Sequence, residues 1–382
     1  MAARSVFERR ITSALDAVPS RIPVILGGCG TGRTFLLHQL RSRLGRSCQY
    51  IDVERSATTP ERFLRAVASV SPFAGHDSGH RPVNPREAFV STLGFMKAAR
   101  GPGGEPVTFL LDEVLELRTF ESFPGLRTVL HDLLDTLAAS SNRFVLTTRY
   151  QARAQRLLGG ASGRFEVIPI AALTPGEVRD ILPQNDATSR DPQEKDFMAR
   201  AVHALADGRP VYVREIADEM ASMSARGGGD PISALTALLS PGGRLYARCC
   251  FSYELRLHRA RGYGALKAIL EILADQEPLT LTEISQRLQR TPGSTKDYLS
   301  WLEDVDLIVA RQKRYSFSDP LLRLWVRLHC RPVPPTDEDV AREVQTYALG
   351  RLPRPEPALA MAGAGAGSGD ERTKPWGIIE ID

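Results

Sequence analysis

Short apolar runs alternate with segments of helical periodicity through the first two-thirds of the chain. The apolar runs are bounded by polar or turn-forming residues, as expected of buried strands. This alternation predicts an α/β domain in which helices cover a parallel sheet. The strands are expected at 22–27, 48–53, 107–112, 143–148 and 165–169.

Other parts of the chain follow different patterns. The N-terminal stretch MAARSVFERRITSALDAV lacks an apolar core and predicts an amphipathic helix rather than a signal peptide. Segment 73–104 is rich in Gly, Pro and His, which predicts exposed loops. A helical region should begin at Thr174, with Pro175 in its first position and Glu177 in its third, and continue to about residue 222.

Residues 262–328 predict a compact winged helix-turn-helix. Three helical patterns, YGALKAILEILAD, LTLTEISQRL and TPGSTKDYLSWLEDVDLI, precede VARQKRYSFSD, which is typical of a two-stranded hairpin. The small, polar stretch ALAMAGAGAGSGDERTKP that follows later predicts a flexible linker. No apolar run approaches the ~18 residues of a membrane span, so no membrane contact is expected.

Composition adds two constraints. The five cysteines show no paired or metal-ligand spacing, which indicates free thiols and a cytoplasmic protein. The net charge is only +4, but residues 244–331 carry 15 Lys and Arg against 10 Asp and Glu, while residues 332–382 carry 5 against 9. The winged-helix region is therefore the basic part of the chain, which is compatible with nucleic-acid contact.

The first predicted strand leads into GGCGTGRTF, the layout of a phosphate-binding loop. Glycines let the backbone curl until several N–H groups point at one phosphate, and the following helix adds partial positive charge. Thr34 can offer its hydroxyl oxygen to Mg²⁺. The alternative for this segment alone is a glycine-rich turn without function. The candidate nucleotide-binding residues are Gly27, Gly28, Cys29, Gly30, Thr31, Gly32, Arg33, Thr34 and Phe35.

A second motif favours the nucleotide interpretation. The third predicted strand ends in Asp112 and Glu113. An additional-strand (ASCE) ATPase uses such a pair: Asp112 would hold Mg²⁺ through water, and Glu113 would orient and deprotonate the attacking water. The alternative is a pair of solvated charges at a strand end.

Arg33 departs from the phosphate-loop pattern, which has lysine at this position. Arginine keeps the positive charge and can bind phosphate in a bidentate manner, but it is longer, planar and forked. We therefore expect ATP binding to survive and hydrolysis to be slow.

With these motifs, the chain resembles the archaeal-type ATPases of the AAA+ and STAND group over residues 15–330. RYSFSDPLLRLWVRL is similar to the family's ending after the wing. The resemblance implies a P-loop NTPase fold with sheet order 5-1-4-3-2, a helical lid and a C-terminal winged helix. The implied divisions are a P-loop domain at 1–172, a lid at 173–243, a winged-helix domain at 244–331 and a flexible acidic tail at 332–382.

The resemblance also assigns roles to single residues. Thr148 takes the sensor-1 position, with Thr147 as the neighbouring option. Arg164 is a candidate arginine finger, acting on its own nucleotide or on a neighbouring subunit in a homo-oligomer; the alternative is a surface arginine. In DGRPVYVREI, Pro210 would lie near the adenine and Arg209 would act as a sensor-2-like contact, the alternative being a turn followed by a helix.

The winged unit is expected to contact double-stranded DNA, although a protein-binding module is the alternative. Its third helix carries several acidic residues, so backbone contact is favoured over sequence reading. The expected DNA contacts are Arg290, Lys296, Arg311, Lys313 and Arg314. The terminal KPWGIIEID contains an apolar WGII segment that could bind a protein partner by strand addition, the alternatives being a fold back onto its own body and a frayed tail.

Together these patterns predict an ATP- and Mg²⁺-dependent P-loop ATPase or nucleotide switch with a winged helix for DNA or protein contact. The alternative, from a different class, is a non-hydrolysing scaffold or regulator in which nucleotide only locks the domain arrangement.

Overall fold

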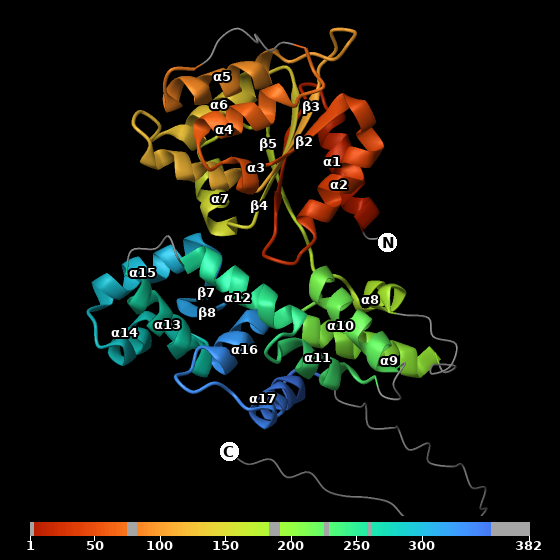
Figure 1. Ribbon diagram of the computed structural model, residues 1–382, viewed down its shortest axis with the longest axis vertical. Coiled ribbons are helices and arrows are strands. Elements are labelled where there is room, and N and C mark those ends of the chain that lie inside the picture. Colours follow the sequence, from red (N-terminus) through yellow and green to blue (C-terminus); the bar gives the residue numbers. More distant parts are fainter. Residues whose placement is uncertain (1–3, 75–81, 183–191, 225–228, 258–261, 353–382) are drawn as a thin grey trace, which may run out of the picture. The chain divides into compact units, whose positions relative to one another are not determined.

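The first 170 residues are built around a five-stranded parallel sheet (Figure 1). The computed structural model describes residues 4–74, 82–182, 192–224, 229–257 and 262–352. The strand order β2-β3-β4-β1-β5 is the predicted order 5-1-4-3-2, so the sheet topology is confirmed. The strands are β1 (Ile22–Leu26), β2 (Cys48–Asp52), β3 (Thr108–Asp112), β4 (Arg143–Thr148) and β5 (Phe165–Pro169).

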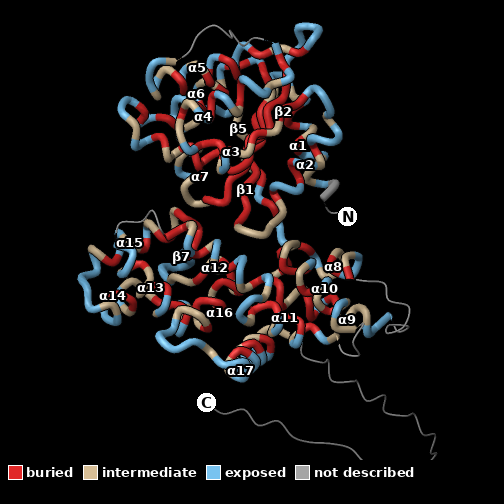
Figure 2. The backbone as a smooth tube through the Cα atoms, viewed as in Figure 1, coloured by how far each residue is buried: buried red, intermediate tan, exposed pale blue. Residues whose placement is uncertain are grey.

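Helices cover both faces of this sheet, because its strands bury side chains on both sides (Figure 2). On one face Ile25 and Val145 pack with Ile11 and Leu36 of the first two helices. On the other face the stacked rings of Phe109 and Phe144 lie among the remaining helices. The helices are α1 (Arg4–Asp16), α2 (Arg33–Leu44), η1 (Gly45–Ser47), α3 (Val53–Ser56), α4 (Pro60–Leu64), η2 (Arg65–Ser69), α5 (Pro85–Ala98), η3 (Val114–Ser122), α6 (Val129–Ala139) and α7 (Gln151–Leu158).

The prediction of exposed loops across 73–104 is wrong for residues 85–98, which form the helix α5. Asn84 caps the N-terminus of α5 by accepting from the Glu87 N–H, and Pro85 occupies the first turn. Apolar side chains then recur at helical spacing and are buried, among them Phe89 and Met96. The Gly and Pro content of the flanking residues outweighed this periodicity in the sequence interpretation. Residues 75–81 lie outside the described part.

A helical region follows the sheet, as predicted. Thr174 forms a capping box with Glu177 at the start of α8. A break at Asp207 and Gly208, both in the left-handed backbone region, separates α9 from α10. The helices are α8 (Pro175–Ile181), α9 (Pro192–Ala206), α10 (Pro210–Ser224), α11 (Pro231–Leu239) and α12 (Arg244–Leu257). Among the described residues, no helix combines the length and the apolar character needed to cross a membrane.

The winged unit has the predicted order of three helices and a hairpin. Its second helix begins with a capping box between Thr280 and Glu283. A short strand that was not predicted, β6, adds to the hairpin to give the antiparallel order β6-β8-β7. The elements are α13 (Tyr263–Asp275), β6 (Leu279–Thr280), α14 (Leu281–Leu288), α15 (Pro292–Asp304), β7 (Ile308–Arg311), β8 (Arg314–Phe317) and α16 (Pro320–His329).

The prediction of a flexible tail from residue 332 is wrong for its first part. Residues Asp337–Leu349 form α17, capped by Thr336. Its buried face includes Val340 and Val344, and the Tyr347 hydroxyl donates to the Leu205 carbonyl of α9 at 3.0 Å. The acidic residues of its first turn are favourable at a helix N-terminus. The predicted linker and the WGII segment lie outside the described residues. The predicted boundaries at 172 and 243 stay predictions.

Asn142 ties the end of α5 to the start of β3, so we predict that Asn142→Ala destabilises the protein by about 3 kcal/mol. The side chain is fully buried. Its oxygen accepts the Val107 N–H at 3.1 Å, and its nitrogen donates to the Met96 and Ala99 carbonyls at 2.9 and 3.0 Å. Alanine removes the side-chain partner of the Val107 N–H and of the Met96 carbonyl, while the Ala99 carbonyl keeps a hydrogen bond from Arg100. Urea unfolding of both proteins measures the difference.

Ser141→Ala is the matched control for that measurement. The Ser141 hydroxyl accepts an exposed hydrogen bond from Arg100. The free energy of unfolding of the Ser141→Ala variant should therefore stay within about 0.5 kcal/mol of wild type. Equal effects of the two substitutions would contradict the assigned role of Asn142.

Candidate functional site

The loop between β1 and α2 has the curled backbone of a phosphate-binding loop. Gly30 and Gly32 have φ angles of 80° and 86°, in the left-handed region that favours glycine. The Thr31 hydroxyl donates to the Gly28 carbonyl at 2.9 Å. A Cβ atom at Gly27 would lie 2.6 Å from that hydroxyl oxygen, so only glycine fits there. The loop ends at the N-terminus of α2, where Thr34 and Phe35 are exposed.

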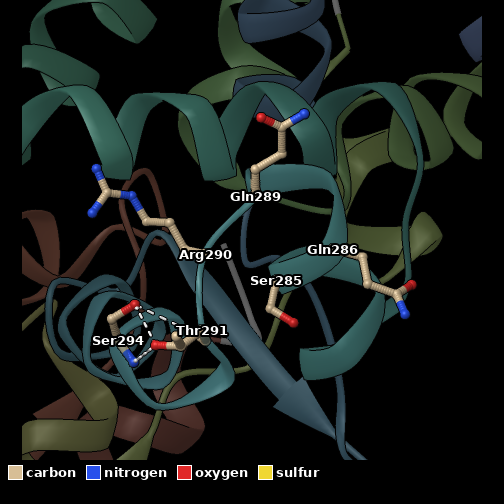
Figure 3. A pocket seen from close by; sticks show the side chains of 6 residues that line it. All are labelled: Ser285, Gln286, Gln289, Arg290, Thr291 and Ser294. Carbon is tan, nitrogen blue, oxygen red and sulfur yellow. Dashed lines mark hydrogen bonds between the residues drawn. The ribbon is translucent and has the colours of Figure 1, made fainter.

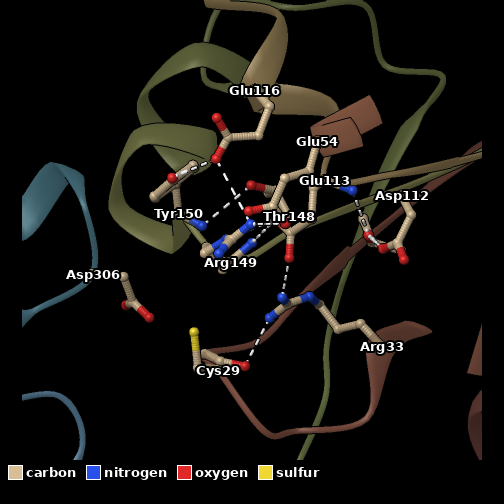
Figure 4. A network of polar contacts seen from close by, with 12 residues as sticks. Cys29, Arg33, Glu54, Asp112, Glu113, Glu116, Thr148, Arg149, Tyr150 and Asp306 are labelled. Carbon is tan, nitrogen blue, oxygen red and sulfur yellow. Dashed lines mark hydrogen bonds and ion pairs between the residues drawn. The ribbon is translucent and has the colours of Figure 1, made fainter. Parts of the chain in front are cut away.

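The Arg33 side chain points toward Glu113 at the acidic strand end (Figure 4). It is 7% exposed. One terminal nitrogen donates to the Gly28 carbonyl at 2.7 Å, and the other pairs with the Glu113 carboxylate. The sequence placed a phosphate-binding cation here, whereas in this structure the charge of Arg33 is balanced by the predicted general base.

The carboxyl end of β3 brings Asp112 and Glu113 next to β4. Thr147 links them, because its hydroxyl donates to Asp112 at 2.5 Å and accepts the Glu113 N–H at 3.0 Å. The Tyr50 hydroxyl donates to the other Asp112 oxygen at 3.0 Å. Glu113 has a φ of 57°, a left-handed conformation uncommon outside glycine that is often held in place at functional sites.

Arg149 is the second cation on Glu113, and the sequence interpretation did not include it. Its backbone N–H donates to Glu113 Oε2 at 3.0 Å, and its Nε lies 3.3 Å from the same oxygen. Burial favours the neutral form of Glu113, but Arg33 and Arg149 outweigh this and keep its pKa below the ordinary value. Glu113 is therefore ionised and held by two guanidinium groups.

Further carboxylates surround Arg149. Glu54, next to β2, accepts a 2.5 Å hydrogen bond from Arg149 Nη2. Glu116 lies 3.7 Å from the same nitrogen and accepts from the Tyr150 hydroxyl at 2.5 Å. One signal in the sequence could have identified Arg149. It directly follows the fourth predicted strand, and therefore lies at the sheet edge where the loop and the acidic pair also lie.

Two residues assigned through the family resemblance make no contact with the acidic pair. Thr148 is buried and accepts the Tyr150 N–H at 3.2 Å, while its neighbour Thr147 makes the contact to the acidic pair. Arg164 lies at the amino end of β5, the opposite edge of the sheet from the loop. Its guanidinium donates to the carbonyls of Ser20, Ala138 and Ser140. The geometry therefore contradicts a finger acting on its own nucleotide.

The lid residues of the motif at 207–216 do reach the loop. Arg209 Nη1 donates to the Cys29 carbonyl at 2.8 Å and to Asp319 Oδ2 at 3.1 Å. The Val211 N–H donates to the Gly30 carbonyl at 3.3 Å. Pro210 begins α10 between these two contacts. The start of α10 is thus fixed against the loop.

Two residues of the region 244–331 also lie at the loop, and no local signal indicated them. Asp306 follows α15, and its Oδ2 would lie 3.2 Å from a Cβ atom at Gly28. Burial raises the pKa of Asp306 to about 6, although Arg256, Arg209 and Arg33 oppose this shift. Arg256 of α12 contacts the Cys29 sulfur. These contacts join segments more than 200 residues apart, which periodicity and spacing do not report.

The residues present fit a nucleotide that brings its own metal ion. Arg33 and Arg256 each keep a buried Nε without a hydrogen-bond acceptor, which suits an added anion. No group of three or more His, Cys, Asp or Glu residues within the described ranges is arranged to hold a metal. Mg²⁺ would therefore be held mainly by phosphate oxygens and water, with Asp112 and Thr34 as the protein's contribution.

The winged unit presents a separate polar surface. The five predicted DNA contacts are all exposed: Arg290, Lys296, Arg311, Lys313 and Arg314. A polar hollow lies at the turn between α14 and α15 (Figure 3). It is lined by Ser285, Gln286, Gln289, Arg290, Thr291 and Ser294.

The sheet order, the curled loop and the acidic strand end together define an α/β fold of the P-loop ATPase kind. The Walker-type ATPase PABY2304 of Pyrococcus abyssi is similar in structure, with a TM-score of 0.63 at 18% identity over 85% of this chain and 95% of that one.

Two further solved structures match more loosely. The Orc1 protein of Aeropyrum pernix in complex with DNA matches with a TM-score of 0.43 at 18% identity, over 89% of this chain and 92% of that one. The RuvB Holliday junction branch migration motor of Thermotoga maritima matches with a TM-score of 0.41 at 13% identity, over 82% of this chain and 91% of that one. No family model and no curated protein matches the sequence.

We predict that Arg33 and Glu113 are energetically coupled. Arg33→Gln and Glu113→Gln should each lower the free energy of unfolding by about 3 kcal/mol, since each leaves a buried charge without its partner. The double variant should lose about 1–3 kcal/mol less than the sum of the two single losses. A double-mutant cycle from urea unfolding measures the difference, and additive losses would contradict the ion pair.

The pH dependence supplies a second test of the same pair. Because the pKa of folded Glu113 lies below its ordinary value, its ionised form stabilises the protein above that value. This contribution is lost as the pH falls through the folded pKa. The gap between wild type and Glu113→Gln should therefore narrow at acidic pH, and a constant gap would speak against an ionised Glu113.

Proposed function

We propose that this protein binds ATP with Mg²⁺ and acts as a nucleotide-dependent switch whose hydrolysis is slow. The observation that carries the proposal is the curled loop at α2 facing an acidic strand end, within the fold of a P-loop ATPase. The loop amides and the start of α2 would bind the phosphates. Asp112 and Thr34 would hold the metal ion that bound nucleotide supplies, and that ion would offset charge on the transferred phosphoryl group.

We infer slow hydrolysis because the charged side chains of the site are already paired with one another. A general base must be free to accept a proton, but two guanidinium groups hold Glu113 in its ionised form and lower its basicity. A phosphate-binding cation must be free to pair with phosphate, but the two terminal nitrogens of Arg33 are held by Glu113 and by the Gly28 carbonyl of the loop. Hydrolysis therefore requires both side chains to leave this pairing. The non-hydrolysing scaffold is the second candidate, and the same ion pair favours it.

Nucleotide occupancy would be sensed through the lid. Arg209 and Val211 both contact the carbonyls of the loop, so a change in loop conformation reaches α10 directly. Arg209 also binds the Ser318 carbonyl and the Asp319 carboxylate, which belong to the winged unit. This chain of contacts supports a switch.

Cytoplasmic location and homo-oligomer formation stay predictions.

We expect wild type to bind ATP·Mg²⁺ in calorimetry and to turn it over at a near-zero rate in a single-turnover assay. Arg33→Lys should raise that rate about tenfold or more, because lysine is a compact point charge that suits the loop. Glu113→Gln should keep binding and abolish any residual hydrolysis.

Three outcomes would separate the candidates. Absence of ATP·Mg²⁺ binding by wild type would end the nucleotide proposal. Equal, near-zero rates for wild type and Glu113→Gln, with no gain in Arg33→Lys, would favour the scaffold. Arg43→Lys, an exposed arginine on the same helix, is the matched control and should leave both quantities unchanged.

We also propose that the winged unit contacts the backbone of duplex DNA. The wing turn between β7 and β8 exposes Arg311, Lys313 and Arg314, and the hollow beside Arg290 lies at the N-terminus of α15, where backbone N–H groups favour a phosphate. Acidic residues later in α15, Glu303 among them, disfavour deep entry into a groove.

Replacing Arg311, Lys313 and Arg314 by glutamine should weaken duplex binding about tenfold or more at low salt and flatten its salt dependence. Each lost phosphate contact removes one released counterion from the equilibrium. Fluorescence anisotropy with a mixed-sequence duplex at several salt concentrations measures both quantities.

The control is a triple variant with the same change in charge on the P-loop domain. Arg43, Arg46 and Arg65 are exposed there, and their replacement by glutamine should leave duplex binding near wild type. If wild type does not bind at low salt, or if the two triple variants behave alike, the DNA proposal is wrong.

A further inference from the structure

Arg256 is a deeply buried cation at the phosphate-binding loop. It is 2% exposed and extends from α12. Nη2 contacts the Cys29 sulfur, Nη1 donates to the Asp306 carbonyl at 2.7 Å, and Nε has no hydrogen-bond acceptor. It forms no ion pair with any residue in the described ranges. Burying a cation without a paired anion is unfavourable, so its surroundings suit an added negative charge.

The loop side of this contact is electropositive. Burial raises the pKa of the Cys29 thiol, but Arg256, Arg149 and Arg33 outweigh burial and bring the pKa below its ordinary value. Ser252 lies one helical turn before Arg256, and its hydroxyl is 3.8 Å from the same sulfur. The same face of α12 therefore points two polar side chains at the loop.

The neighbouring charges leave Arg256 as the cation available to a phosphate. Arg33 and Arg149 are paired with Glu113, and Arg209 is paired with Asp319. The carboxylate of Asp306 faces the loop at Gly28 and would repel an incoming phosphate.

We infer that Arg256 is a phosphate-binding residue of this site, so that α12 supplies the cation that the loop itself lacks. This inference rests on the proposed nucleotide site. It assigns to Asp306 the opposite effect, because that carboxylate faces the loop at Gly28 and would repel an incoming phosphate. Nucleotide affinity is then set by a residue more than 220 positions from the loop.

Calorimetric titration of the full chain with ATP·Mg²⁺ tests the assignment. Arg256→Gln should weaken binding about tenfold to a hundredfold, the range expected for a hydrogen bond between charged groups. Asp306→Asn should tighten binding several-fold. Opposite effects from two substitutions in one cluster are not expected of a merely structural role.

Arg256→Lys keeps the charge but loses the forked contact, so it should weaken binding only a few-fold. Arg248→Gln is the matched control on the same helix, because Arg248 is exposed and pairs with Glu215. It should bind as wild type does. Thermal unfolding of each variant reports whether it is folded, and if Arg256→Gln is not, the Arg256→Lys and Asp306→Asn variants carry the test.

If wild type binds ATP·Mg²⁺ and Arg256→Gln binds it with the same affinity, this inference is overturned and the proposed function is unaffected. With Arg256→Gln unfolded, unchanged affinity in both remaining variants overturns it as well. Equal losses in Arg256→Gln and Asp306→Asn indicate a structural contact and overturn it too. If wild type itself fails to bind ATP·Mg²⁺, the proposed function fails and the inference fails with it.

Discussion

The sharing of one carboxylate between two buried guanidinium groups organises the carboxyl edge of the sheet. Glu113 binds Arg33 from the loop and Arg149 from the strand beside it. Either cation would be unfavourable at this depth without the anion, and the anion without them. Its left-handed backbone and the hydrogen bond from its N–H to Thr147 fix the direction of the side chain. The loop, β3 and β4 therefore meet in one charge-balanced arrangement.

A second set of charges surrounds the first and comes from distant parts of the chain. Arg209 reaches the loop from the lid, and Arg256 and Asp306 reach it from the region of the winged unit. Coupling between binding sites is reciprocal, so any ligand that displaces these side chains changes affinity at the loop, and phosphate at the loop changes affinity for that ligand. The site is better described as an assembly of three segments than as a loop motif.

Patterns within one segment of the sequence predicted the local structure well. Contacts between distant segments could not be predicted from the sequence. The strands followed from apolar runs, their order from the resemblance carried by the two motifs, and the capping box at Thr174 from its spacing to Glu177. The helix α5 was missed because flanking Gly and Pro outweighed an apolar spacing that included Phe89. Arg33 was assigned to phosphate because a motif specifies residue type and not side-chain direction. Asp306 could not be assigned, since only the folded chain brings it to Gly28.

Asp319 gives this architecture a mechanical property. Its Oδ1 accepts the N–H groups of Leu321 and Leu322 at the start of α16. Its Oδ2 accepts from Tyr212 of α10 and from Arg209, which directly precedes α10. One carboxylate thus joins the first turn of α16, in the winged unit, to α10, the helix that contacts the loop. Because Asp319 is buried, a rotation of α16 relative to α10 would have to break hydrogen bonds of this carboxylate, so the two helices are expected to move as one body.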